Sequence, residues 1–222
     1  MSEPAWKRVT AAENLEYRWP ATAAIVVAVV LQVLLPDALV PGVRYVLPAL
    51  EVLLLVALVA GDPIRITRRS RRQRMVGLAL TAAIGVANTW SVVLLVREIL
   101  DAHESAAGPL LLSGGAIYLT NIIVFALLYW ELDRGGPAAR AHGEQDLPDF
   151  LFVQMQSPDV SPANWEPHFT DYLYLAFTNA TAFSPTDVMP LSRWAKLTMM
   201  LQSAVALIVA AFVVARAVNV LG

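Results

Sequence analysis

The architecture of this chain is decided by DYLYLAFTNATAFSPTDVMPLSRWAKL, residues 171–197. Its first half follows the three-and-four spacing of one helical face, and Thr170 or Asp171 can cap the free N–H groups of the first turn. A helix of about 13 residues is too short to cross a hydrocarbon core of about 30 Å. The polar stretch that follows contains two prolines and leads into an apolar run. We therefore predict a short re-entrant helix, whose buried face comprises Tyr172, Leu175, Ala176, Asn179 and Phe183.

The polar stretch after this helix is the first candidate functional site. Irregular backbone at membrane depth is tolerated only where it is buried in protein or lines water, and the carboxyl end of a helix attracts cations. The interpretation is an ion pathway for monovalent cations. Two alternatives stay open: Asp187 is a cap or loop anchor, and the segment plugs a helix junction in a non-conducting scaffold or accessory subunit. The constriction would be lined by Asn179, Thr181, Ser184, Thr186 and Asp187.

The composition points to a membrane protein. Of 222 residues, 57% are apolar and 15% are charged, whereas soluble domains have about 45–50% and about 25%. A net charge of −2 gives no reason to expect nucleic acid as a partner. With no cysteine and three isolated histidines, the sequence offers no metal-ligand spacing, and no catalytic or phosphate-binding motif occurs. We expect neither an enzyme nor a bound cofactor.

Five apolar runs are long enough, or nearly so, to cross a membrane. The predicted fold is an all-α membrane protein with five transmembrane helices plus one short re-entrant helix before the last span. Its parts are an N-terminal segment (1–18), a four-helix region (19–130), a solvated polar loop (131–169) and the re-entrant unit with the last span (170–222). The predicted spans are 19–40, 43–61, 75–100, 108–130 and 195–221.

Orientation is predicted from the arginines and lysines. Six arginines lie between residues 65 and 74, and with five spans thirteen basic residues fall on one side against three on the other. The positive-inside rule then puts the N-terminus in the cytoplasm and the C-terminus outside. Contact with membrane lipid headgroups is expected as a second role of this loop, and the residues concerned are Arg68, Arg69, Arg71 and Arg72.

Polar side chains inside the predicted spans form a second group of candidates. Glu51 lies eight residues into the second span, and an ionisable group there is costly. It is interpreted either as a proton or cation site, as in a proton-coupled transporter, or as a buried hydrogen-bonding group or one near the headgroups. Interhelical hydrogen bonds or a pathway lining are the two readings for Asn88, Ser91, Thr120 and Asn121.

The segment YLYLAFTNATAFSPTDVMPLSRWAKL resembles the pore helix, filter and start of the inner helix of tetrameric potassium channels. The filter motif of that family would fall on residues 182–187. Asp187 and the downstream Pro190 match it, whereas both glycines are missing, so the filter is degenerate. This resemblance implies a homo-oligomer, a tetramer by analogy, with an ion pathway.

Most of the chain also resembles an uncharacterised family of bacterial integral membrane proteins, a domain of unknown function. The shared features are LLYWELDRGG at residues 127–136, the segment from Asp171 to Leu197 and a last apolar helix. This likeness implies a multi-pass protein of the bacterial inner membrane, and it brings no activity.

Overall fold

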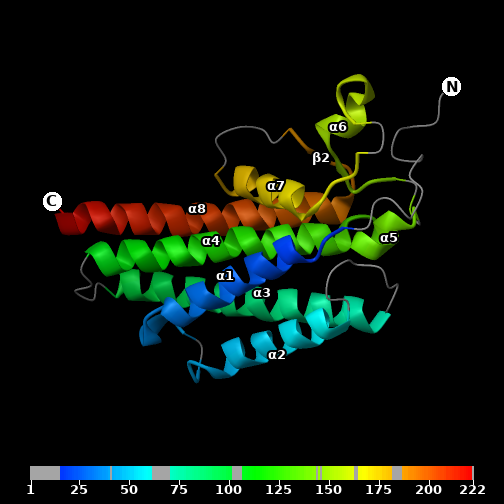
Figure 1. Ribbon diagram of the computed structural model, residues 1–222. Helices are drawn as coiled ribbons and strands as arrows, with labels where there is room; N and C mark the ends of the chain where they lie inside the picture. The colour runs from blue at the N-terminus through cyan, green and yellow to red at the C-terminus, as the bar shows by residue number, and fades with distance from the viewer. Residues whose placement is uncertain are drawn as a thin grey trace.

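The computed structural model describes residues 16–40, 42–61, 71–101, 107–143, 145, 147–162, 165–181 and 187–221. Helices account for most of these residues (Figure 1). The long ones are α1 (Trp19–Leu34), α2 (Val46–Gly61), α3 (Arg71–Leu100), α4 (Ala107–Leu132) and α8 (Arg193–Leu221). The short elements are η2 (Asp37–Leu39), η3 (Asp133–Gly135), α5 (Pro137–Ala141), β1 (Phe150–Leu151), α6 (Val153–Gln156), η4 (Pro158–Val160), α7 (Phe169–Thr181) and β2 (Met189–Pro190).

Helix α4 is the central element of an elongated bundle. It packs against α1, α3, α7 and α8, and every residue from Thr120 to Leu127 is buried. A helix that is apolar and buried all round belongs in the interior of a bundle. Helices α1, α3 and α8 lie alongside it, while α2 lies outside α1 and α3 (Figure 1).

The prediction of five membrane spans is met in part. Three helices, α3, α4 and α8, are long and apolar enough to cross a membrane. Helices α1 and α2 are apolar but have 16 residues each, which is about 24 Å at 1.5 Å per residue. The run expected over 19–40 ends as a helix at Leu34, because Leu35 precedes Pro36 and takes an extended conformation.

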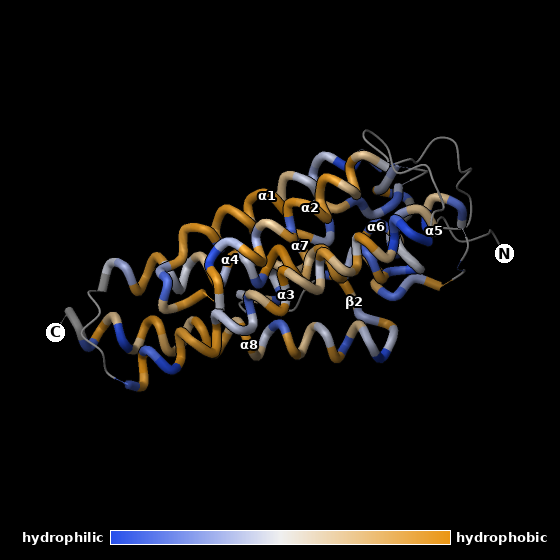
Figure 2. Tube along the Cα trace, turned by 90° about the horizontal axis from the view of Figure 1, so that it is seen from below, coloured by the Kyte–Doolittle hydropathy of each residue, from blue (hydrophilic) through white to orange (hydrophobic). Residues whose placement is uncertain are grey.

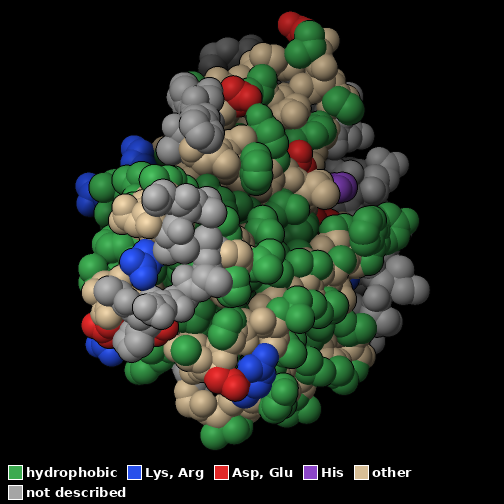
Figure 3. Space-filling model, turned by 90° about the vertical axis from the view of Figure 1, so that its left-hand side faces the viewer, with side chains coloured by type: hydrophobic (Ala, Val, Ile, Leu, Met, Phe, Trp, Pro, Cys, Tyr) green, Lys and Arg blue, Asp and Glu red, His purple; other side chains and the backbone are tan. Residues whose placement is uncertain are grey.

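The outer surface of the long helices is largely apolar. Apolar residues run along the helices, and hydrophilic ones gather around α5 and α6 (Figure 2). The face at the C-terminal end of the bundle is covered mainly by hydrophobic side chains, with few charges (Figure 3). Helix α8 exposes apolar side chains along its length, including Leu197, Leu207 and Val218, each more than 60% exposed.

Glycine residues allow helix α4 to approach helices α8 and α3 closely. A Cβ added at Gly114 of α4 would lie 2.5 Å from a methyl carbon of Val213 on α8, whereas the neighbouring Gly115 faces open space. Gly85 of α3 likewise faces Val124 of α4, at 3.2 Å. Small residues at such crossings let helix backbones pack closely in a membrane.

The linker over 131–169 differs from the solvated loop expected from its charges. Asp133, Arg134 and Arg140 are buried, as are Phe150 and Phe152. Charged side chains can be buried when they pair with one another and with backbone groups, and a sequence does not show such pairing. The linker also supplies β1, which pairs antiparallel with β2 in the polar stretch before α8, although no strand was expected.

Candidate functional site

Helix α7 begins with a cap supplied by its own aspartate. Asp171 Oδ2 accepts a 2.8 Å hydrogen bond from the backbone N–H of His168, the residue before the helix. A carboxylate at this position satisfies one of the free donors at the helix start. The expectation that Thr170 or Asp171 caps this helix is confirmed for Asp171.

The inner face of α7 is the one expected from the sequence. Tyr172, Leu175 and Ala176 are fully buried against the bundle, where α7 lies against α4 and α8. The opposite face is open, with Tyr174 and Phe177 about half exposed. Phe183, predicted on the same inner face, lies outside the described residues.

The carboxyl end of α7 is joined to α8 by a buried glutamine. Gln202 Oε1 accepts hydrogen bonds from Asn179 Nδ2 at 2.7 Å and from the Tyr129 hydroxyl of α4 at 2.8 Å. Its Nε2 donates to Ala176 O at 2.8 Å. Ser203 adds a bond from its hydroxyl to Asn179 O. Asn179 O is one of the last four carbonyls of α7, groups that a helix terminus leaves free, and Ser203 satisfies it.

The junction shows how far α7 runs along the bundle. Ser203 is ten residues beyond Arg193, the first residue of α8, so it lies about 15 Å along that helix. Helix α7 therefore ends about 15 Å along α8, which is about a third of the length of that helix.

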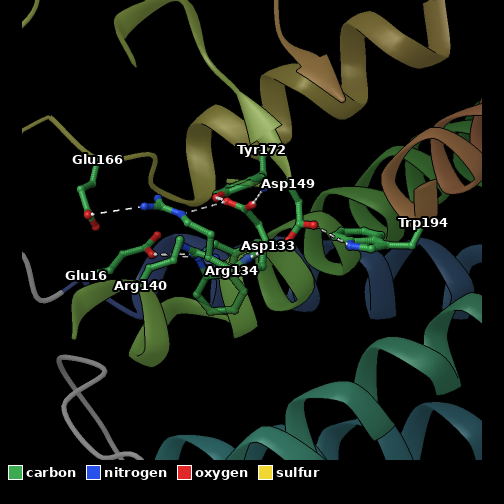
Figure 4. A network of polar contacts seen from close by, with 9 residues as sticks. Glu16, Asp133, Arg134, Arg140, Asp149, Glu166, Tyr172 and Trp194 are labelled. Carbon is green, nitrogen blue, oxygen red and sulfur yellow. Dashed lines mark hydrogen bonds and ion pairs between the residues drawn. The ribbon is translucent and has the colours of Figure 1, made fainter. Parts of the chain in front are cut away.

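The amino end of α7 is held by a buried polar network (Figure 4). The Tyr172 hydroxyl donates to Asp133 Oδ2, and the backbone N–H of Phe169 donates to Glu16 Oε1. The guanidinium of Arg140 lies 5.0 Å from the centre of the Tyr172 ring, a cation–π contact. The network fixes the start of α7 against the end of α4.

Arg140 also terminates α4. Its Nη1 donates to Trp130 O at 2.6 Å and to Asp133 O at 3.0 Å, and its Nη2 lies 3.7 Å from Glu16 Oε2. The last carbonyls of a helix carry partial negative charge, so a buried cation is stabilised there.

Asp149 links the network to α8. Its Oδ1 accepts a hydrogen bond from Trp194 Nε1 at 2.8 Å, and its Oδ2 accepts one from the backbone N–H of Arg134 at 3.0 Å. Its own N–H donates to Asp133 Oδ1. The two aspartates thus tie the linker, the end of α4 and the start of α8 into one unit (Figure 4).

A left-handed turn makes this arrangement possible. Arg134 has φ 49° and is followed by Gly135 and Gly136, with φ 83° and 97°. A Cβ at Gly136 would lie 2.9 Å from the carbonyl oxygen of Glu131, so the turn requires glycine there. The guanidinium of Arg134 lies 3.8 Å from Glu166, and burial raises the pKa of the Glu166 carboxyl above its ordinary value.

The chain returns from the tip of α7 to the end where α7 began. Leu191 N donates to Asp149 O at 2.8 Å, and β2 pairs with β1 beside the polar network. Helix α8 then starts at this end and runs the whole length of the bundle (Figure 1). The segment between α4 and α8 therefore enters and leaves by the same end.

Of the five predicted constriction residues, three can be located. Asn179 faces α8 and bonds Gln202 and Met199 O. The Thr181 hydroxyl bonds to Thr178 O within its own helix. Asp187 is exposed, with the Tyr174 hydroxyl 3.4 Å from its Oδ2. Ser184 and Thr186 lie outside the described residues. Asn179 and Thr181 are two residues apart on α7, so their side chains point in different directions.

Of the four arginines predicted to contact lipid headgroups, two belong to the described residues and two do not. Arg71 and Arg72 lie in the first turn of α3, which starts four residues earlier than expected, and both are exposed. Arg68 and Arg69 are outside the described residues.

The polar residues expected inside the spans are buried. The Ser91 hydroxyl donates to Leu39 O at 2.8 Å and so joins α3 to η2, whereas Thr120 bonds to Ala116 O within α4. Asn88 and Asn121 are 5% and 2% exposed. Glu51 is fully buried, and neither of its carboxylate oxygens has a hydrogen-bond partner within the part of the chain that the structure describes.

Sequence reasoning missed the residues that hold α7 in place. Gln202 lies in the predicted last span and Tyr129 near the end of the fourth, yet neither stands out by spacing. For the polar network, the glycine pair after Arg134 was the available signal, because two glycines directly after a helix indicate a left-handed turn. Within the described ranges, His, Asp and Glu side chains form no group of three or more that could hold a metal ion.

No protein-family model, no curated protein and no solved structure matches this chain. The helices define only the class of the protein. It is an all-α protein, and its long apolar helices are typical of membrane proteins.

Proposed function

We propose that this chain is one subunit of an oligomeric, channel-like membrane protein that passes monovalent cations. The pathway would run beside the carboxyl end of α7 and the segment that follows it, with Asn179, Thr181, Ser184, Thr186 and Asp187 at the constriction. Several copies are needed, because a single copy of this length offers one α7 and one α8 and cannot surround a water-filled path with them.

The observation that carries the proposal is the path of the chain through α7. This helix starts at the end where α4 stops and runs about a third of the way along α8, and the chain then comes back to pair β2 with β1. In a membrane, this path would leave the free carbonyls at the end of α7 inside the apolar layer, which tolerates them beside water or protein. The carboxyl end of α7 would attract a cation, and Asp187 adds a negative charge on the return.

A second function is favoured by the contacts of Asn179. Its amide is bonded to Gln202 and to Met199 O, so it faces α8 and is not turned to an open path. Such a junction suits a non-conducting scaffold or accessory subunit, in which α7 closes the gap between α4 and α8.

The orientation of the helix bundle in the membrane is part of the same proposal. The starts of α3 and α8 and the end of α4 lie at one end of the bundle (Figure 1). Arginines and lysines of the described residues concentrate there, which supports a cytoplasmic position for this end in a bacterial inner membrane. They are Arg71, Arg72, Arg74, Arg134, Arg140, Arg193 and Lys196.

Flux through liposomes separates the two functions. Purified protein should pass potassium or sodium ions under a voltage gradient, and Asp187→Ala should reduce that flux several-fold. Asp159→Ala is the matched control, an exposed aspartate on η4 away from α7, and Arg71→Ala is a second. Liposomes that stay silent with correctly folded wild-type protein would refute conduction and favour the scaffold.

The oligomeric state gives an independent test. The chain should run as a homo-oligomer in mild detergent, with a tetramer expected from the resemblance to potassium channels. A strict monomer would remove the shared pathway. Because the native chain has no cysteine, one cysteine introduced at position 187 can be labelled from either side, and a reaction only from outside would overturn the orientation.

A further inference from the structure

Glu51 occupies a position on α2 where an apolar residue is expected. The buried stripe of this helix comprises Pro48, Glu51, Leu55 and Leu58, at helical spacing. Glu51 is 0% exposed, while residues on either side of it in sequence are open to the outside. Its carboxyl group therefore points into the apolar contact that α2 makes with α1 and α3.

The polar neighbour of this carboxyl is Gln32 of α1. The side-chain amide of Gln32 lies close enough to interact with the Glu51 carboxyl, but the two groups do not reach the distance and angle of a full hydrogen bond. Gln32 Nε2 and both Glu51 oxygens are buried without a hydrogen-bond partner in the described part of the chain. Two polar side chains buried only to stabilise the fold would be expected to form hydrogen bonds with all of their buried donors and acceptors. The Glu51 carboxyl and the Gln32 amide do not.

Among the described residues of the helices that pack around Glu51, no charged side chain lies beside it to compensate its charge. Helix α1 contains no charged residue, and Glu51 is the only one in α2. The charged residues of α3 lie in its first and last turns, and Gly61, which faces Gln73 near the start of α3, is about 15 Å along α2 from Glu51. Arg44, seven residues before Glu51, is paired with Asp37 and bonded to Val33 O.

We infer that Glu51 and Gln32 form a proton-binding site between α1 and α2. An ionised carboxylate with no partner is strongly disfavoured in an apolar interior, and a bound proton removes its charge. A metal ion would need more ligands than the carboxylate and one amide oxygen supply, since calcium takes six to eight. The ligand class is therefore the proton. This site is separate from α7 and does not depend on the proposed conduction.

A hydrophobic carbodiimide tests the site by its chemistry. A protonated carboxyl transfers its proton to a carbodiimide nitrogen, and its oxygen bonds to the central carbon to give an O-acylisourea. In an apolar site without water, the acyl group then moves to the neighbouring nitrogen and leaves a stable N-acylurea. All atoms of both reactants are retained, so the modified peptide gains the mass of one reagent molecule.

Wild-type protein in lipid vesicles, treated with dicyclohexylcarbodiimide, should carry this adduct on Glu51, and Glu51→Gln should lose it. A water-soluble carbodiimide with an added amine should modify the exposed Asp37 and leave Glu51 unmodified. Adducts found on Glu131 but not on Glu51, or equal modification of Glu51 by the water-soluble reagent, would overturn the inference. These outcomes are read on the wild-type chain, so they do not depend on how a variant folds.

Infrared spectroscopy provides the second readout. The carbonyl stretching band of a protonated carboxylic acid should be present in wild type, absent in Glu51→Gln and retained in the matched control Glu98→Gln. It should move to lower frequency in heavy water as the proton exchanges with solvent. Gln32→Leu should shift the band towards that of a free acid. Other buried carboxyls can add to this band, so a band whose intensity is unchanged in Glu51→Gln, or one that never exchanges, contradicts a proton-binding site at Glu51.

Discussion

Replacing Gln202 by leucine should loosen the junction that holds the tip of α7. The side chains are similar in size, so the change removes polar contacts without opening a large cavity. The Tyr129 hydroxyl, on a residue that is 0% exposed, loses its acceptor, and Ala176 O loses a donor. Asn179 keeps its bond to Met199 O. The perturbation is therefore concentrated on one buried hydroxyl and one carbonyl.

The size of the effect follows from these groups. A buried hydroxyl left without a partner costs about 1–3 kcal/mol. The carbonyl and the amide bond add about 0.5–1 kcal/mol, since hydrogen bonds between membrane helices are weak. The leucine side chain buries apolar atoms, which offsets part of this loss of stability. We expect the free energy of unfolding to fall by about 2 kcal/mol.

The assay is equilibrium unfolding in detergent micelles, followed by tryptophan fluorescence. Gln156→Leu, at an exposed position in α6, is the control and should stay within about 0.5 kcal/mol of wild type. Tyr129→Phe combined with Gln202→Leu should cost about 1 kcal/mol less than the sum of the single changes, because each removes the same bond. The hydrogen bonds of this junction would be refuted if Gln202→Leu lost no more stability than the control. They would also be refuted if the losses of Tyr129→Phe and Gln202→Leu were fully additive.

Three further predictions concern other contacts. Gly114→Ala puts a methyl group against Val213 and should destabilise the bundle by about 1–3 kcal/mol. Tyr172→Phe removes a hydrogen bond from Asp133, which is fully buried, and should cost about 1–3 kcal/mol. Burial raises the pKa of Glu166 above its ordinary value of 4.5, so its protonated form favours the folded state. The contribution of Glu166 to stability is present below pH 4.5 and is lost as pH rises through the folded pKa, and Glu166→Gln should remove this pH dependence.

Each of these three predictions has its own control, and the stabilities are measured by thermal unfolding in detergent. Gly115→Ala meets open space and should be harmless, so equal losses at both glycines would contradict the close approach of α4 and α8. Tyr174→Phe, on the exposed face of α7, should have little effect beside Tyr172→Phe. If Glu166→Gln shows the same pH profile as wild type, the buried carboxyl does not govern it.

The re-entrant unit shows how far sequence reasoning carries. Helical spacing and the prolines of the polar stretch predicted a short helix over 170–183, and the structure has α7 at Phe169–Thr181. The partners of this helix were not predictable, because Asn179, Gln202 and Tyr129 meet from three helices that are far apart in the sequence. Asn179 was expected at a constriction, and the contacts it makes are with α8.

The charged linker shows the opposite case. Asp133, Arg140 and Asp149 were expected in solvent from the polarity of their surroundings, and the structure buries the first two in a network with Tyr172 and Trp194. Burial of a charge depends on whether an opposite charge or a free backbone group lies beside it. That information exists only in three dimensions.

The sequence by itself determined that this protein is built from apolar helices, where most of them run and that one is short, because helical periodicity and proline positions act over a few residues. Tertiary structure alone decided that α4 is central, that the chain returns after α7 to the end where that helix began, and that Glu51 faces Gln32 with no balancing charge on the described helices around it. These are properties of neighbours brought together by folding, and the burial that they produce sets the free energy of every polar group involved.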